Sequence, residues 1–246
     1  MIRPAAQSGM SLVELLIGLV ISLLLLAGIV YSFLGQREAS RAVRRLAALH
    51  TNGQAAARVI NAMIGRAGYY PRGLRPASLA FRSGPAVSGK DGKSGKSDEI
   101  TLRFVSDGQM SDCAGGAVPA GLVSINRLYV NDRSHSLVCQ RTLTDNNGAP
   151  AHRADGSRIG SSYTALLEPA GALQITYGVD SDANGAVDRY LTANQVSDFT
   201  RVYSVRVQLR LGVPPHSLSR SKPAQTDPCC QGLEVDQVVA LRNRLP

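Results

Sequence analysis

Residues 9–16 read Gly9-Met10-Ser11-Leu12-Val13-Glu14-Leu15-Leu16, and they open a long apolar stretch. The 20 residues from Leu15 to Leu34 contain no charge and no proline. Each helical residue adds about 1.5 Å, so a helix over this stretch is about 30 Å long, which equals the hydrocarbon thickness of a bilayer. We therefore expect a membrane-spanning helix near the N-terminus, over about residues 12–34.

The apolar stretch differs from a secretory signal that is cut off. Such a signal has a small-residue cleavage site after its apolar core, followed by a polar mature start. Here Ala27 and Gly28 lie inside the stretch, so we expect the helix to be retained. Arg3 precedes it, whereas Arg37, Arg41, Arg44 and Arg45 follow it. The positive-inside rule alone therefore favours the wrong orientation for an exported head.

Glu14 interrupts the apolar pattern at its start. A carboxylate near the bilayer centre costs roughly 2.5 to 3.5 kcal/mol on insertion scales, so carboxylates inside membranes are functional by default. In the alternative interpretation, Glu14 lies at the headgroup level and costs little. The physics of the residue alone leaves both interpretations open.

The sequence from Gly9 to Leu16, followed by an apolar helix, resembles the signal of type IV pilins and pseudopilins. The resemblance implies that a membrane-bound prepilin peptidase cuts between Gly9 and Met10 and methylates the new N-terminus. Residues 1–9 would then be the leader, and Glu14 the fifth residue of the mature chain. The family usually has Phe where this chain has Met10, and many major pilins have a proline that this apolar stretch lacks.

The resemblance also implies a role for Glu14 in assembly. A helix that leaves the bilayer must bury its apolar surface against neighbouring helices. A carboxylate buried with it needs a cation, which the free α-amino group of Met10, or of the next subunit, can supply.

The rest of the helix is amphipathic and basic. Apolar or small residues recur at spacings of three and four from Val43 to Ala67, and Gly68 to Pro71 end the pattern, so we expect one helix over residues 10–67. Residues 36–67 contain one acid, Glu38, and six arginines: Arg37, Arg41, Arg44, Arg45, Arg58 and Arg66. Because no aromatic residues interleave with them, we favour a solvated face or acidic neighbours in a filament over nucleic acid.

Residues 68–246 are expected to form one β-rich head. The whole chain is 44% hydrophobic and 18% charged, with 24 Gly, no Trp and a net charge of +9. This composition excludes a disordered tail, a fibre and a polytopic membrane protein. Apolar residues alternate with polar ones around Ile100, Leu173, Val205 and Val239, which indicates antiparallel strands with one buried face. Residues 82–98, rich in Gly, Ser and Lys, are expected to be a flexible surface loop. The predicted fold class is α+β: a long N-terminal helix packed on an antiparallel sheet.

The head resembles PilW-type minor pilins. The residues that carry the resemblance are Asp112-Cys113, Leu137-Val138-Cys139, the block from Tyr177 to Tyr190, and the closing segment from Val239 to Leu245. It implies a non-enzymatic subunit that primes a type IV pilus or joins its tip complex, with other minor pilins, the major pilin and a tip adhesin as partners. The subunit would sit in the inner membrane with its head in the periplasm, and then in the pilus.

Two other classes of protein remain as alternatives. A J-type minor pseudopilin of type II secretion shares the signal and a β-rich head. A membrane-anchored enzyme is the third class, but the chain has no G-x-S-x-G, H-E-x-x-H or P-loop motif.

Four cysteines allow three pairings, and an exported head meets an oxidising periplasm. We expect a disulfide between Cys113 and Cys139, closing a loop of about 25 residues and contributing roughly 3 kcal/mol. Cys229 and Cys230 are adjacent, so a bond between them would form a strained ring; pairing elsewhere and a reduced state both stay open. Scattered histidines and the lack of Cys-x-x-Cys argue against zinc.

The segment from Asp180 to Asp188 matches the first part of a calcium loop. Asp180, Asp182 and Asn184 occupy positions 1, 3 and 5, followed by Gly at position 6 and Asp188 at position 9. The twelfth position is Leu191, so the bidentate Glu is missing. The alternative is a β-hairpin turn, because Asp, Asn and Gly are turn formers and strand-like residues flank the segment.

Overall fold

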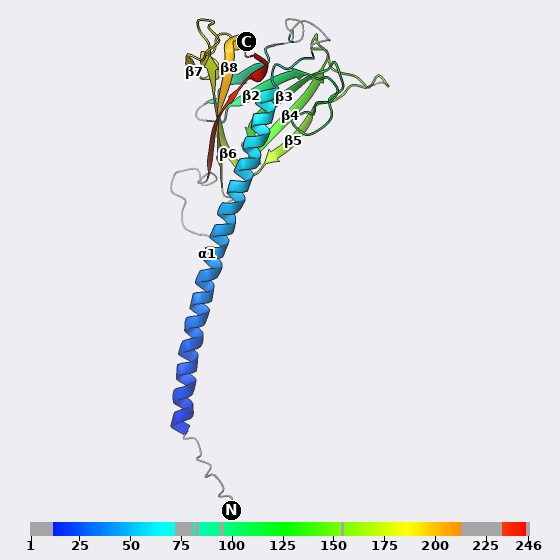
Figure 1. Cartoon of the computed structure of the whole chain (residues 1–246). Helices are drawn as coiled ribbons and strands as arrows, with labels where there is room; N and C mark the ends of the chain where they lie inside the picture. The colour runs from blue at the N-terminus through cyan, green and yellow to red at the C-terminus, as the bar shows by residue number, and fades with distance from the viewer. Residues whose placement is uncertain are drawn as a thin grey trace, which may run out of the picture. The chain divides into compact units, whose positions relative to one another are not determined.

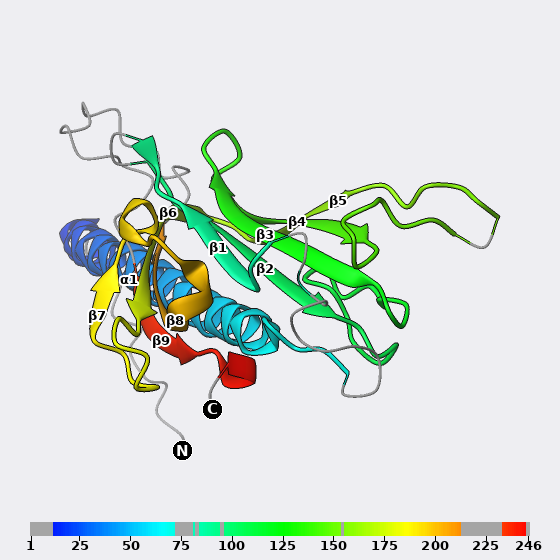
Figure 2. The same cartoon turned by 90° about the horizontal axis from the view of Figure 1, so that it is seen from above.

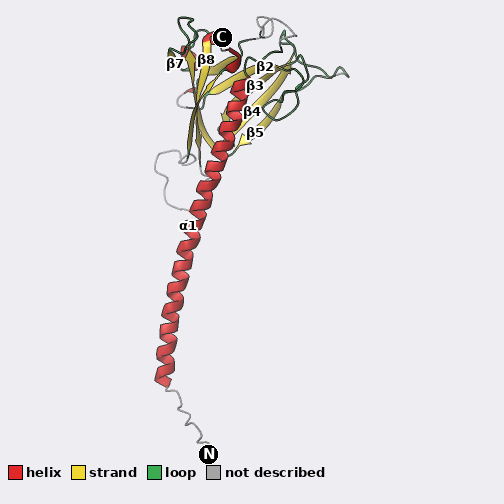
Figure 3. Ribbon diagram, in the orientation of Figure 1, coloured by secondary structure: helices red, strands yellow, loops and turns green. Residues whose placement is uncertain are grey.

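The computed structural model describes residues 12–71, 81, 84–93, 96–153, 155–212 and 233–244. It comprises two units, one up to Ala48 and one from Leu49 onward. Figure 1 labels the elements, and Figure 3 separates the helix from the strands by colour.

Helix α1 runs from Leu12 to Arg66 and contributes to both units. Glu14 in its first turn and Arg66 in its last turn have the signs that the helix dipole favours. In the first unit, Leu12–Arg37 is apolar enough to span a membrane, with a mean hydropathy of 2.7, and none of it is buried. The hydroxyl of Ser22 donates to the carbonyl of Gly18 at 2.7 Å, so this polar group is satisfied within the helix.

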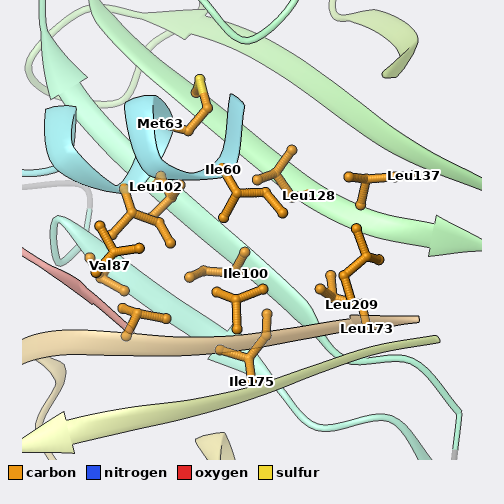
Figure 4. Close-up of a cluster of buried hydrophobic side chains, with 14 of the residues drawn as sticks. Ile60, Met63, Val87, Ile100, Leu102, Leu128, Leu137, Leu173, Ile175 and Leu209 are labelled. Atoms are coloured by element: carbon orange, nitrogen blue, oxygen red, sulfur yellow. The ribbon is translucent and has the colours of Figure 1, made fainter. Parts of the chain in front are cut away.

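The part of α1 that belongs to the second unit is amphipathic. Its buried residues recur at helical spacing: Leu49, Ala56, Ile60, Met63 and Ile64. They join one hydrophobic core with side chains from both sheets, and Figure 4 shows Ile60 and Met63 near Leu102 and Leu128. The helix end is capped by Asn243, whose amide donates to the carbonyls of Gly65 and Ala67.

Two antiparallel sheets complete the second unit, and Figure 2 shows strands of both beside the cyan end of α1. The first sheet has the order β1-β2-β3-β4-β5. Its strands are β1 (Val87–Lys90), β2 (Glu99–Val105), β3 (Val123–Asn131), β4 (Ser136–Thr144) and β5 (Ser162–Leu167).

The second sheet has the order β7-β6-β8-β9. Its strands are β6 (Ala170–Val179), β7 (Arg189–Leu191), β8 (Val202–Leu211) and β9 (Glu234–Ala240). Short 3-10 helices cover Ala193–Gln195, Phe199–Arg201 and Arg242–Arg244.

The α+β fold class predicted from the sequence is confirmed. Alternation places Leu173, Ile175 and Tyr177 of β6 in the core, with Val205, Val207 and Leu209 of β8. Phe104 continues the buried face of β2 but lies in a smaller cluster with Val118, Leu143 and Ala151.

The expectation that residues 82–98 are wholly a loop is wrong. Residues Val87–Lys90 form strand β1, which pairs with β2 in the register Val87↔Leu102 and Gly89↔Ile100. The reason lies in tertiary packing: a Cβ on Gly89 would stand 1.9 Å from Oη of the buried Tyr177. Glycine at this position therefore makes room for an aromatic side chain of the other sheet.

Asp98 ties the two sheets together. Its backbone N–H donates to the carbonyl of Leu173 at 2.7 Å, and its carboxylate accepts from the N–H groups of Ile175 and Gly92, each at 2.8 Å. These bonds explain why a carboxylate that is only 6% exposed is tolerated in the core.

Two glycines of α1 give opposite predictions. A Cβ on Gly65 would have nothing within 4 Å, so Gly65→Ala is expected to raise the free energy of unfolding by about 1 kcal/mol through helix propensity. At Gly53 the Cβ would lie 2.7 Å from Cδ2 of Leu233 and 3.3 Å from Leu211 and Val235, so Gly53→Ala should lose stability through overpacking. Melting of the full chain in detergent measures both; a shift of the same sign in the two variants would contradict this packing.

Candidate functional site

Glu14 is the charged group at the start of the exposed apolar helix. It lies in the first turn of α1 and is exposed, while Gly9 and Met10 lie outside the described residues. The apolar side chains around it, from Leu12 to Leu34, are each at least half exposed, on every side of the helix. A helix that is apolar all round needs an apolar environment, either lipid or other helices.

The second feature is a disulfide that holds the loop between β2 and β3. The structure joins Cys113 of this loop to Cys139 of β4, with their Cα atoms 6.2 Å apart. Both residues are buried, and Cys139 is fully so. The N–H of Cys113 donates to Oδ1 of the buried Asn126, which fixes the loop against β3. The expected pair is therefore brought together, whereas Cys229 and Cys230 lie outside the described residues.

A buried ion pair lies beside the disulfide. Oδ2 of Asp112 is 3.1 Å from Nε of Arg141, and the Asp112 side chain is 2% exposed. Oδ1 of Asp112 also accepts from the N–H groups of Ala114 and Gly116. With its partner and both hydrogen bonds in place, the burial of this charge is compensated.

The end of α1 contacts the same loop. Nη1 of Arg66 donates to the carbonyl of Ser111 at 2.9 Å. The helix, the loop and β4 are thereby linked around the disulfide.

The acidic segment after β6 forms the third feature. Within the described residues, Asp180, Asp182 and Asp188 are the group of potential metal ligands whose oxygens lie within 4.8 Å of one another. Asp180 is buried, and its Oδ1 accepts from the N–H of Ala183 and its Oδ2 from the N–H of Gly185. Burial opposes ionisation of Asp180, but these backbone hydrogen bonds outweigh it and lower its pKa.

The other polar residues of the segment stabilise the same turn through hydrogen bonds. Oδ2 of Asp188 accepts from the N–H of Ser181 at 2.6 Å, and the amide of Asn184 donates to Oδ2 of Asp182 at 2.9 Å. The segment joins β6 to β7, which pair as a hairpin with Leu191 in the second strand. The carboxylates thus stabilise the turn by accepting hydrogen bonds within it, and calcium binding stays a prediction.

Calcium titration tests that prediction. If the loop binds calcium with a Kd of about 0.1 mM, 1 mM calcium should stabilise the chain by about 1.4 kcal/mol. Asp182→Asn is expected to abolish this gain, because it removes one exposed carboxylate and leaves Asp180, which braces the turn, intact. Magnesium at equal concentration is the control, and an unchanged melting temperature with unchanged proteolysis would show that the loop does not bind calcium.

Two family models match the chain. The model described as Type IV Pilus-assembly protein W matches residues 127–242, from β3 through the start of the 3-10 helix after β9, and includes Cys139 and the acidic segment. The model of the prokaryotic N-terminal methylation motif matches residues 4–30, which include Gly9, Met10 and Glu14. These two matches support a type IV minor pilin, and the similarity to the PilW family covers residues 127–242.

Among solved structures, the chain shows a distant similarity to a pilin. A type IV-like pilin from Thermus thermophilus aligns with a TM-score of 0.45 and 15% identity, covering 82% of this chain and 98% of that chain. Among curated proteins, a sequence search finds no match. The apolar helix and the methylation motif together support membrane anchoring of the chain.

Sequence reasoning missed the polar groups that surround the disulfide. Asn126, Arg141 and Arg66 carry no local motif, because their partners in the loop are reached only after folding. Asp112 could have been found, since it stands next to Cys113 in a segment rich in glycine, where a carboxylate commonly accepts backbone N–H groups.

Proposed function

We propose that this PilW-type minor pilin primes the assembly of a type IV pilus or forms part of its tip complex, as a structural and non-enzymatic subunit. One observation supports the proposal above others: α1 is a single helix with two kinds of surface. Its first part is exposed and apolar with Glu14 at the start, and its last part is buried in its own head. The exposed apolar surface of the first part can therefore contact lipid before assembly and neighbouring helices after assembly.

The proposal implies the following order of events. Prepilin peptidase cuts between Gly9 and Met10 and leaves a free, methylated amino group. The helix holds the subunit in the inner membrane with its head in the periplasm. On extraction, the apolar surface of Leu12–Leu34 is buried against neighbouring subunits, which retains the hydrophobic free energy that the bilayer supplied. The carboxylate of Glu14 then neutralises an α-amino group, because neither charge is stable alone in that environment.

The head supplies the contacts that distinguish a minor pilin from the major subunit. Its loop between β2 and β3 is fixed by the disulfide, by the Asp112–Arg141 pair and by Arg66. A loop held by a covalent bond and a buried ion pair keeps one shape, which lowers the entropic cost of docking on another head. The expected partners are other minor pilins, the major pilin and the tip adhesin.

Co-purification tests this function and separates it from the secretion alternative. The full chain, tagged at its C-terminus and solubilised from native membranes in mild detergent, is expected to recover pilus minor pilins and the tip adhesin. Recovery of type II secretion pseudopilins in their place would assign it to the J-type role. The double variant Cys113→Ala/Cys139→Ala should weaken recovery, whereas Tyr163→Ser, on the exposed edge strand β5, is the matched surface control.

A further inference from the structure

The assembly role leaves a basic stripe of α1 unexplained. Arg37, Arg41 and Arg44 follow the apolar segment at spacings of four and three, which places them on one face of the helix. Phe33 precedes Arg37 by four residues and lies on the same face. Residues 36–48 contain four arginines and one acid, Glu38, so this segment carries a net charge of +3, which is 4 − 1.

The stripe begins where the membrane-spanning segment ends. The candidate span closes at Arg37. The guanidinium carbon of Arg37 lies 4.3 Å from the centroid of the Phe33 ring, within the range of a cation–π contact. An aromatic ring with a cation on it is typical of the boundary between hydrocarbon and headgroups, because the ring prefers the apolar side and the charge the wet side.

The three guanidinium groups are free to take an anion. Arg37, Arg41 and Arg44 are exposed, and the ion pairs found within the described ranges involve none of them. The rise of the helix sets Arg41 about 6 Å and Arg44 about 10 Å beyond Arg37. The headgroup layer outside the hydrocarbon core is about 5 to 8 Å thick, and long arginine side chains extend back toward it.

We propose that Arg37, Arg41 and Arg44 bind the phosphate groups of anionic phospholipids in the leaflet from which α1 emerges. Lipid fits better than an acidic protein surface because the stripe is continuous with the membrane-spanning segment and starts at the level of the phosphates. The guanidinium fork matches phosphate oxygens in pairs, which a lysine does not. Such contacts hold the helix at a fixed depth, and so keep the subunit in place until it is extracted.

Lipid selectivity of the full chain in mixed vesicles tests the proposal. Spin-labelled phosphatidylglycerol and phosphatidylcholine report, by electron paramagnetic resonance, how strongly each lipid associates with the reconstituted protein. Each basic residue near an anionic surface contributes enough to change association about fivefold. The triple variant R37Q/R41Q/R44Q is therefore expected to lose at least a tenfold preference for phosphatidylglycerol, while keeping the helix, because glutamine is a good helix former.

Two further variants serve as controls for the position and for the charge of the stripe. Arg58→Gln removes one positive charge from an exposed position farther along the same helix, and it should leave the preference unchanged. R37K/R41K/R44K retains the charges but not the paired donors of the guanidinium group, so its preference should lie between those of the wild-type chain and the glutamine variant. An unchanged preference in the glutamine variant would overturn the proposal. The proposal would also be overturned if the glutamine variant kept its preference for phosphatidylglycerol but was lost from filaments. That result would indicate that the stripe pairs with carboxylates of neighbouring subunits.

Discussion

The Glu14→Ala variant is expected to be cleaved normally but to be depleted from sheared filaments by about a hundredfold or more. Removing one partner of a buried ion pair costs about 3 to 5 kcal/mol, because the other charge is left buried and alone. Cleavage should be unaffected, since the cut lies between Gly9 and Met10 and the helix itself is preserved. Quantitative mass spectrometry of the subunit in filaments and in membranes gives the ratio directly.

A matched control separates charge from any disturbance of the apolar surface. Ser22→Ala changes a polar residue of the same exposed segment whose hydroxyl is already satisfied by Gly18, so incorporation should stay normal. Glu14→Gln, which keeps size but not charge, should be nearly as depleted as Glu14→Ala. Normal incorporation of either Glu14 variant would show that this carboxylate has no role in assembly.

Removal of the disulfide is expected to cost about 3 kcal/mol of stability. Cys113 and Cys139 are 26 residues apart, and opening a loop of this length returns that much conformational entropy to the unfolded chain in the chain-entropy model. Denaturation of Cys113→Ala/Cys139→Ala in detergent, compared with the wild-type chain, measures the loss. Faster proteolysis should begin in the loop around Asp112, because this loop has lost its covalent attachment to β4.

The second cysteine pair provides the control for this experiment. Cys229→Ser/Cys230→Ser is expected to leave the unfolding transition nearly unchanged, and a reducing agent should bring the wild-type chain to the stability of the Cys113→Ala/Cys139→Ala variant. Equal losses in the two cysteine variants would contradict the assignment of the stabilising bond to Cys113 and Cys139 alone.

The elements that could be predicted from the sequence are those with a local period. The apolar helix is recognisable because no charge and no proline interrupts residues 15–34, and β8 is recognisable because Val205, Val207 and Leu209 alternate with polar residues. These patterns depend only on which side of an element faces the core. They therefore do not require knowledge of the partner element.

The parts that sequence reasoning missed depend on distant partners. Strand β1 contains Gly, Ser and Lys, which do not indicate a strand. Its glycine has a structural reason only in the folded chain, because Tyr177 occupies the space above Gly89. Likewise, Asp98 resembles a loop residue until Ile175 and Leu173 are seen to bond to it. Tertiary contacts override weak local propensity at such positions.

The proposed processing and incorporation of this protein are tested together by mass spectrometry of the N-terminal peptide, taken from whole membranes and from sheared surface filaments. We predict a chain that begins at methylated Met10 in both fractions. An uncut chain that retains Met1 to Gly9, in cells with an active prepilin peptidase, would contradict the assignment of this protein to the processed minor pilins.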